Sequence, residues 1–363
     1  MMDYRGRSRA VQVALAKSGV DAFVVTHLPN IRYLSGFTGS AGAFLITANQ
    51  TILFTDGRYT VQAREEVKTA KIKIAGKPPL SLAAEWLSTN ARNLGRKRVG
   101  VEGEHVTFSQ YQGLKKLLGS GFKVRQSSGL VEQLRIVKDK QEMDRIREAV
   151  MLGAGLFETA LATIRAGAKE IEVAAEMEHE ARRRGAEGMS FETIIASGAR
   201  SALPHGRASS AVIERRGFVV CDFGVILAGY CSDMTRTVYV GSPTAEERAL
   251  YEAVRAAQEA SIRAVRPGVS VGEVDRAGRN VLKKKGLGKY FTHSTGHGVG
   301  LEIHEAPRVA AGQEQILLPG MVITIEPGAY LPGKAGVRIE DMVVVTEAGR
   351  EVLTPTPKDL ITI

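Results

Sequence analysis

Four carboxylates and one imidazole in the second half of the chain lie in segments that are typical of buried strands and tight turns. They belong to Asp222, Asp233, His297, Glu326 and Glu340. A carboxylate that is buried without a partner costs several kcal/mol, so a core that collects four of them needs cations to balance their charge. The five side chains together predict a site for two metal ions.

A predicted β-hairpin would bring two of these carboxylates together. Asp222 and Asp233 lie in the strand-like runs 217–224 and 229–238, which are rich in apolar and β-branched residues. If the connecting loop centres just after Leu227, Asp222 lies directly opposite Asp233. The Cβ atoms of directly opposed residues are about 4.5–5.5 Å apart, and two metals in a hydrolase lie roughly 3.5–4 Å apart. One hairpin could therefore contact both ions.

The other three candidate ligands come from separate segments. His297 lies in a glycine-rich stretch, where the backbone can pack closely against a cluster. Glu326 follows an apolar run and precedes a Pro-Gly turn, so it is expected at the end of a strand. The run 336–345 is expected to form one strand, in which Arg338 and Glu340 share a face.

The chemistry of the ligand set indicates which metals it would bind. Carboxylate oxygens dominate, one imidazole is present and no thiolate takes part, which favours Mn²⁺, or Co²⁺ or Fe²⁺, over a structural zinc site of Cys and His, although catalytic Zn²⁺ is also compatible. Two such ions lower the pKa of a shared water and stabilise charge that develops on a carbonyl oxygen. Glu326 is the candidate that accepts the proton of the water. The prediction is a metal-dependent hydrolase.

Six short segments carry a pattern that resembles a known family. They are residues 204–206 (PHG), 222–224 (DFG), 232–237 (SDMTRT), 296–305 (GHGVGLEIHE), 325–328 (IEPG) and 336–341 (GVRIED). The pattern is similar to that of the proline-specific metallopeptidases aminopeptidase P and prolidase, which share the pita-bread fold with methionine aminopeptidase and creatinase. The match is dense from about residue 141 to the C-terminus and looser over residues 30–40 and 53–59.

The resemblance implies an α+β architecture in two domains. Residues 131–363 would form the pita-bread catalytic domain, an antiparallel sheet flanked by helices. Residues 1–130 would form a smaller α/β, creatinase-like N-terminal domain that contributes to substrate access and oligomer contacts. It also implies a homodimer, and every metal position of the family is occupied here by the expected residue type.

The resemblance further implies roles for residues around the metals. His205 and His304 would bind the substrate carbonyl and stabilise or protonate the tetrahedral intermediate. His293 would contact substrate, and Arg338 would hold the carboxylates of the site and the peptide in place. Arg308 occupies the place where prolidases carry an arginine for the proline carboxylate, and a bidentate guanidinium suits that task.

The expected substrates are peptides that contain proline. An Xaa-Pro bond is a tertiary amide without an N–H group, so a peptidase that relies on metals avoids the need to hold that group. Residues 36–40 and 55–59 look more like aminopeptidase P, which removes the first residue of longer Xaa-Pro peptides, and this is the leading interpretation. The alternative is an Xaa-Pro dipeptidase, as Arg308 suggests. A creatinase-like chemistry without metals and a non-catalytic binding module are disfavoured, because no ligand has been lost.

Composition and charge limit the classes of protein to which the chain can belong. The 363-residue chain is 44% hydrophobic and 24% charged, and no apolar run is long enough for a membrane span or a secretory signal. Cys221 and Cys231 are expected as reduced core thiols of a cytoplasmic protein. Residues 1–130 carry 19 Lys and Arg against 8 Asp and Glu. This excess of positive charge predicts a solvated basic face, or a face that attracts peptide carboxylates or an acidic partner subunit. Because no aromatic-rich basic stripe accompanies it, no nucleic-acid partner is expected.

Periodicity and capping signals predict the secondary structure in outline. Helices are expected over residues 4–18, 60–67, 80–94, 109–118, 140–162, 170–184, 245–265 and 271–285. Strands are expected in the first domain over residues 22–26, 43–47, 51–54, 99–101 and 123–125. The alternation in the first domain is typical of a small α/β fold.

Overall fold

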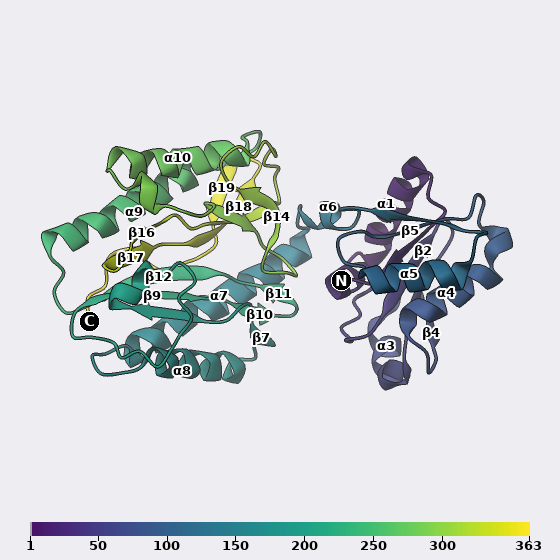
Figure 1. The fold of residues 1–363 in the computed structure, drawn as a ribbon, viewed down its shortest axis with the longest axis horizontal. Helices are drawn as coiled ribbons and strands as arrows, with labels where there is room; N and C mark the ends of the chain where they lie inside the picture. The colour runs from purple at the N-terminus through teal and green to yellow at the C-terminus, as the bar shows by residue number, and fades with distance from the viewer. Residues whose placement is uncertain (1) are drawn as a thin grey trace. The chain divides into compact units, whose positions relative to one another are not determined.

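The computed structural model describes residues 2–363 and separates into two compact units (Figure 1). The first unit ends at Arg135 and the second begins at Ile136, within five residues of the boundary near Val131 that the sequence predicts. Helix α6 (Glu132–Arg135) belongs to the first unit because both of its ends are tied to Asn30. Asn30 Nδ2 donates to Glu132 Oε1 at 2.5 Å, and Arg135 Nη1 donates to Asn30 Oδ1 at 2.7 Å.

The first unit is built on a six-stranded mixed sheet in the order β4-β3-β2-β1-β5-β6. Its strands are β1 (Ala22–Val25), β2 (Ala43–Thr47), β3 (Thr51–Thr55), β4 (Lys71–Ile74), β5 (Arg98–Glu102) and β6 (Lys123–Ser127). Besides α6, its helices are α1 (Tyr4–Ser18), α2 (Leu28–Ser35), α3 (Thr60–Glu66), α4 (Pro79–Thr89) and α5 (Phe108–Leu118). The strands β1, β2, β3 and β5 pack with α4 and α5 in one apolar core, and the α/β prediction is confirmed.

Four long helices of the second unit have clear local causes. They are α7 (Lys140–Thr163), α8 (Glu170–Arg183), α9 (Ala245–Ala264) and α10 (Val271–Lys284). Helix α9 starts at a capping box, in which the Thr244 hydroxyl accepts from the Glu247 backbone and the Glu247 carboxylate accepts from the Thr244 backbone. Asp139 and Glu142 form the same arrangement at the start of α7.

The strands of the second unit form antiparallel sheets. One sheet has the order β12-β9-β8, one β11-β10-β7, one β14-β13-β15-β18-β19 and one β16-β17. Figure 1 shows these strands between the pair α7 and α8 on one side and the pair α9 and α10 on the other. This is the α+β arrangement of helices against antiparallel sheets that the sequence predicts.

Their bounds follow the chain order. The strands are β7 (Gly188–Met189), β8 (Ile194–Ser197), β9 (Gly217–Phe223), β10 (Val225–Leu227), β11 (Tyr230–Cys231), β12 (Met234–Val240), β13 (Gly296–Gly298), β14 (Glu305–Val309), β15 (Val322–Ile325), β16 (Gly328–Leu331), β17 (Ala335–Arg338), β18 (Asp341–Thr346) and β19 (Gly349–Val352). Short 3₁₀ turns lie at Gly198–Ala202 and Gly288–Tyr290.

The hairpin that carries the two aspartates is present, but its predicted register is wrong. Asp222 pairs with Thr235 and not with Asp233. Ala228 and Gly229 form a two-residue loop with φ of 48° and 84°, which is the geometry of a type I′ turn. The turn therefore centres one residue later than expected, and Asp233 precedes the partner of Asp222 by two residues.

The two cysteines lie on this hairpin, in β9 and β11, and both are free and buried. Burial raises the pKa of Cys231 to about 12 and that of Cys221 further, so both are protonated thiols at neutral pH. Within residues 2–363, no helix combines the length and the apolar composition that a bilayer-spanning segment needs.

Candidate active site

A cavity of about 740 Å³ in the second unit is lined by all ten residues that the sequence analysis selected. They are His205, Asp222, Asp233, His293, His297, His304, Arg308, Glu326, Arg338 and Glu340. Asp222 lies on β9, His297 on β13, and Glu326 directly after β15. These strands belong to two different sheets, so the site lies where the sheets meet.

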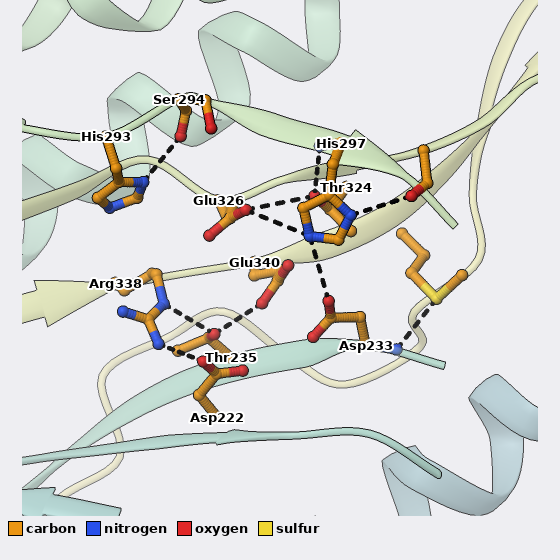
Figure 2. A network of polar contacts seen from close by, with 12 residues as sticks. Asp222, Asp233, Thr235, His293, Ser294, His297, Thr324, Glu326, Arg338 and Glu340 are labelled. Atoms are coloured by element: carbon orange, nitrogen blue, oxygen red, sulfur yellow. Dashed lines mark hydrogen bonds and ion pairs between the residues drawn. The ribbon is translucent and has the colours of Figure 1, made fainter. Parts of the chain in front are cut away.

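The single strand expected over residues 336–345 is instead two strands. β17 ends at Arg338 and pairs with β16, whereas β18 begins at Asp341 and pairs with β15. Glu340 lies between them, and its backbone N–H bonds the carbonyl of Thr235 at 3.1 Å. The chain thus changes sheet at Ile339 and Glu340, and this change places the Glu340 carboxylate among the other acidic groups (Figure 2).

Asp233, His297 and Glu340 form a compact group of potential metal ligands in the cavity. Each offers a ligand atom within 4.8 Å of those of the other two. His297 Nε2 lies 3.5 Å from Asp233 Oδ2 and 3.6 Å from Glu326 Oε1 (Figure 2). His297 Nδ1 lies 3.0 Å from the Gly298 carbonyl, so Nδ1 carries the proton and Nε2 presents its lone pair to the carboxylates.

Glycine at position 296 permits this placement of His297. A Cβ on Gly296 would lie 1.9 Å from the Thr324 carbonyl oxygen, a distance that no side chain can occupy. The His297 backbone N–H then donates to Thr324 Oγ1 at 3.1 Å. The glycine-rich segment therefore lets β13 approach β15 closely, as the sequence analysis expected.

The electrostatics of the carboxylates favour cations. Burial raises the pKa of Asp233 and of Glu340 well above the usual range, and the neighbouring carboxylates add to the shift. Burial raises the pKa of Glu326 to about 7 and lowers that of His297 to about 4. In the absence of cations the cluster therefore holds protons that carboxylates normally release.

Two buried oxygen atoms show that the donor set fits metal ions. Oδ1 of Asp222 and Oδ1 of Asp233 are buried, and neither has a hydrogen-bond partner among residues 2–363. A buried oxygen without a partner costs free energy, whereas hard divalent cations bind such atoms. Oxygen-rich ligands with one imidazole match Mn²⁺, Co²⁺ or Fe²⁺.

Comparisons with known proteins identify the family of the chain. Residues 144–347 match metallopeptidase family M24, and residues 7–137 match the creatinase/prolidase N-terminal domain. The chain belongs to metallopeptidase family M24. The expected family, the pita-bread catalytic domain and the creatinase-like first domain are thereby confirmed.

Three relatives of this M24 chain have names that state an activity. An Xaa-Pro dipeptidase from Pyrococcus horikoshii is 39% identical over 346 residues, which is 95% of each chain. The structure of an Xaa-Pro dipeptidase from Bacillus anthracis superimposes with a TM-score of 0.95 at 40% identity, over 99% of this chain and all of that one. An X-Pro aminopeptidase from Thermotoga maritima gives a TM-score of 0.88 at 38% identity, over 95% and 98% of the two chains.

Arg338 organises one side of this M24 site. Its Nη2 contacts Oδ2 of Asp222, and its Nε donates to Thr235 Oγ1 at 3.1 Å. Its Nη1 donates to the Pro204 carbonyl at 2.9 Å and to the Tyr330 hydroxyl at 2.8 Å. Four partners fix the guanidinium. The buried Asp222 carboxylate contacts this guanidinium through Oδ2 only.

Thr235 and Tyr330 are site residues that the sequence analysis did not select. The Thr235 hydroxyl accepts from Arg338 and donates to Glu340 Oε2 at 2.7 Å. Thr235 could have been found from the hairpin register, which places it opposite Asp222. Tyr330 could have been found only from the pairing of β16 with β17, which carries its partner Arg338.

Both ring nitrogens of His293 are used by protein partners. Nδ1 lies 2.8 Å from the Ser294 carbonyl, and Nε2 lies 2.9 Å from the Tyr330 hydroxyl. Because a carbonyl only accepts, Nδ1 donates, and Nε2 accepts the Tyr330 proton when the ring is neutral. Burial lowers the pKa of His293 to about 4, so the ring is neutral at physiological pH. Because both nitrogens are occupied, the contact with substrate that the sequence analysis expected for His293 would involve the carbon atoms of its ring.

His205, His304 and Arg308 present free polar groups to the cavity. Among residues 2–363, no hydrogen-bond partner occurs for the two rings or for the guanidinium of Arg308. The His304 ring lies edge-on to His297, with 4.5 Å between the centroids. Arg308 pairs with His297 in the β13–β14 ladder, so its backbone lies beside that of a metal-ligand candidate.

Proposed function

We propose that this chain is an Xaa-Pro dipeptidase that acts with two divalent cations, with Mn²⁺ as the first candidate. The observation that carries the choice is Arg308, a guanidinium without a protein partner on the cavity wall beside His297. An Xaa-Pro dipeptide ends in a carboxylate directly after the scissile bond, and Arg308 can bind that group with two hydrogen bonds.

The relatives support the dipeptidase over the aminopeptidase that was the leading interpretation of the sequence. Relatives called Xaa-Pro dipeptidase reach 40% sequence identity and a TM-score of 0.95. The segments 36–40 and 55–59, which favoured aminopeptidase P, lie in the first unit and do not line the cavity. An X-Pro aminopeptidase is similar as well, so the length of the substrate is the point to test.

The proposed metal ligands are Asp222, Asp233, His297, Glu326 and Glu340. Divalent cations at this site supply a water of lowered pKa and polarise the scissile carbonyl. Glu326, a carboxylate directly after β15 on the cavity wall, is the candidate that accepts the proton of that water. His297 keeps its orientation through the Gly298 carbonyl.

The remaining residues act on the peptide. His304 and His205 offer ring nitrogens without protein partners to the same cavity, where one can hydrogen-bond the carbonyl oxygen as it gains charge and then donate a proton. Arg338 holds Asp222 and, through Thr235, Glu340. An Xaa-Pro bond has no N–H to grip, so these contacts at the carbonyl and the carboxylate do the positioning.

The test is hydrolysis of dipeptides by protein freed of metal and then loaded with Mn²⁺. Ala-Pro should be cleaved and Ala-Ala should be cleaved poorly, and chelation should remove the activity. Equal rates on the two dipeptides would contradict specificity for proline. Activity that persists after complete chelation would contradict the use of metals.

A homodimer, which the family resemblance implies, also remains a proposal. Light scattering at micromolar concentration should give about twice the mass of the 39.1 kDa chain. The mass of a monomer would contradict the homodimer and would leave the proposed reaction unaffected.

A further inference from the structure

A buried ion pair lies beside the cavity, next to the proposed catalytic His304. Lys138 Nζ lies 3.1 Å from Glu305 Oε2, and the two side chains are 1% and 7% exposed. Glu305 is the first residue of β14, and Lys138 is the third residue of the second unit. Burying two charges is costly unless their geometry is well satisfied, so this pair calls for a reason beyond stability.

The Glu305 carboxylate holds the loop that leads to His304. Its Oε1 accepts from the Glu302 backbone at 3.1 Å. A Cβ on Gly300 would lie 2.6 Å from both carboxylate oxygens, so glycine is needed there to admit the carboxylate. The Gly300 N–H in turn donates to the Glu302 carbonyl at 3.0 Å. Residues 300–305 therefore fold around this one charged group.

Lys138 is itself fixed to the segment that leads to Glu326. Its backbone N–H donates to the Gly320 carbonyl at 2.9 Å, and its neighbour Val137 forms an antiparallel bridge with Met321. Met321 directly precedes β15, and β15 directly precedes Glu326. The side chain of Lys138 thus connects the strand of one proposed catalytic residue with the loop of another.

We propose that Lys138 is a positioning residue, which acts through Glu305 to hold the His304 ring beside His297 at the distance that the reaction needs. The inference rests on the proposed function insofar as His304 acts on the substrate. Lys138 itself does not line the cavity. Its contribution is the position of a ring on a loop, and a misplacement of about 1 Å can lower a rate by about 10²-fold.

Three variants test the inference. Lys138→Met removes the cation that contacts Glu305 Oε2, so the carboxylate should move and displace the loop. Lys138→Met/Glu305→Gln removes both charges, so the loop should return. Lys140→Met is the matched control, because Lys140 forms an ion pair with Asp144 at 3.3 Å, lies two residues away and is 88% exposed.

In Lys138→Met, kcat on an Xaa-Pro dipeptide should fall by roughly 10- to 100-fold, with KM and metal content close to wild type. The double variant should recover most of that loss, and Lys140→Met should lose nothing. A structural role alone would not produce a loss confined to kcat that is reversed by a second substitution.

The position of His304 can also be read without activity. The chain has seven histidines, so the ring nitrogens of the metal-free protein can be followed by NMR, with the His304 signal assigned from its loss in His304→Ala. That signal should shift in Lys138→Met, return towards wild type in the double variant and stay in place in Lys140→Met. If wild type cleaves no Xaa-Pro dipeptide, the proposed function fails, and this signal still decides the inference.

Two results would overturn it. One is an unchanged His304 signal, with unchanged kcat where the wild type is active, in Lys138→Met. The other is a double variant that is no better than the single one, because the loss would then come from packing and not from the charge of Glu305. If Lys138→Met does not fold, the double variant decides: a wild-type His304 signal supports the inference and a displaced one overturns it.

Discussion

The guanidinium of Arg338 contacts one carboxylate oxygen of Asp222, and the other oxygen, Oδ1, is buried without a hydrogen-bond partner in the described part of the chain. One oxygen is thus neutralised by the protein, and the other is available to a cation. The same guanidinium bonds Thr235, which donates to Glu340. Arg338 therefore orients two proposed ligands from one side of the site.

Arg338→Lys should weaken the metal site without removing a ligand. A lysine ammonium cannot contact Asp222, Thr235 and the Pro204 carbonyl at once, because it lacks the planar fork of arginine. Loss of such an outer contact typically costs about 10- to 100-fold in metal affinity, and we expect that range in a calorimetric titration with Mn²⁺. Arg255→Lys, in a surface ion pair with Asp359, is the control and should bind as wild type does.

Asp233→Ala should abolish hydrolysis of Xaa-Pro substrates. It removes a ligand from the group of Asp233, His297 and Glu340 and leaves three proposed carboxylate ligands around fewer cations. Metal analysis should give about one ion or fewer per chain in place of about two. Asp144→Ala, on the exposed face of α7, is the control. Full activity with normal metal content in Asp233→Ala would falsify the dinuclear assignment.

His304→Ala should lower turnover while the metals stay bound. The ring contacts His297 edge-on, and His304 does not belong to the group of Asp233, His297 and Glu340 whose ligand atoms lie within 4.8 Å of one another. Loss of a group that stabilises or protonates the intermediate should lower kcat by about 10²- to 10⁴-fold. Measured together, kcat and metal content decide the role, since a parallel loss of metal would show that His304 is a ligand.

Local sequence signals were sufficient to predict the long helices, but they did not predict every helix and strand of the first unit. The ends of α7 and α9 were predicted within two residues because capping residues lie next to amphipathic runs. Helix α2 and strand β4 were not predicted. Helix α2 has Pro29 near its start and Gly36 in a left-handed conformation after its end, and β4 reads Lys-Ile-Lys-Ile, so both carried usable signals.

The hairpin register shows what a strand pattern cannot decide alone. The side-chain period of two is the same in either register, so the apolar pattern did not distinguish Asp233 from Thr235 as the partner of Asp222. The turn decided it, because Ala228 adopts φ of 48°, a conformation that non-glycine residues seldom take. A turn centred on Ala-Gly was not the expected one.

Ten of the residues that line the cavity were recognisable from their types and motifs, but the residues that support them were not. Tyr330, Thr235 and Lys138 contact site residues that are 8 to 167 positions away in sequence. Such contacts depend on how separate sheets pack, and no local pattern encodes them. The same holds for the change of sheet at Glu340, which split the predicted strand.

The stability of the metal-free protein should depend on pH through Glu326. Burial raises the pKa of Glu326 from its ordinary 4.5 to about 7, so the folded state keeps a proton that the unfolded state releases. Its contribution is therefore fully present below pH 4.5 and is lost as the pH rises through 7, by about 3 kcal/mol in the free energy of unfolding.

Urea unfolding of metal-free wild type and Glu326→Gln at pH 5 and pH 8 measures this contribution together with its coupling to Asp233 and Glu340, whose pKa burial and the Glu326 carboxylate both raise. The histidines whose pKa is lowered by burial are present in both proteins and cancel in the difference. The free energy of unfolding of the wild type minus that of the variant should decrease from pH 5 to pH 8. Addition of Mn²⁺ at pH 8 should restore the stability of the wild type. A difference that does not change with pH would rule out the proton on Glu326.

Arg308→Ala decides between the two Xaa-Pro activities. In a dipeptidase the guanidinium binds the carboxylate that directly follows the scissile bond, so wild type should cleave Ala-Pro quickly and Ala-Pro-Ala slowly, because the tripeptide carries an amide at that place. The substitution should lower kcat/KM for the dipeptide by roughly 10- to 100-fold, as expected for a charge-assisted pair worth about 1.5–3 kcal/mol, and should leave the tripeptide rate nearly unchanged. Arg350→Ala, on an exposed strand away from the cavity, should change neither rate. Fast cleavage of the tripeptide, unaffected by Arg308→Ala, would instead support the aminopeptidase.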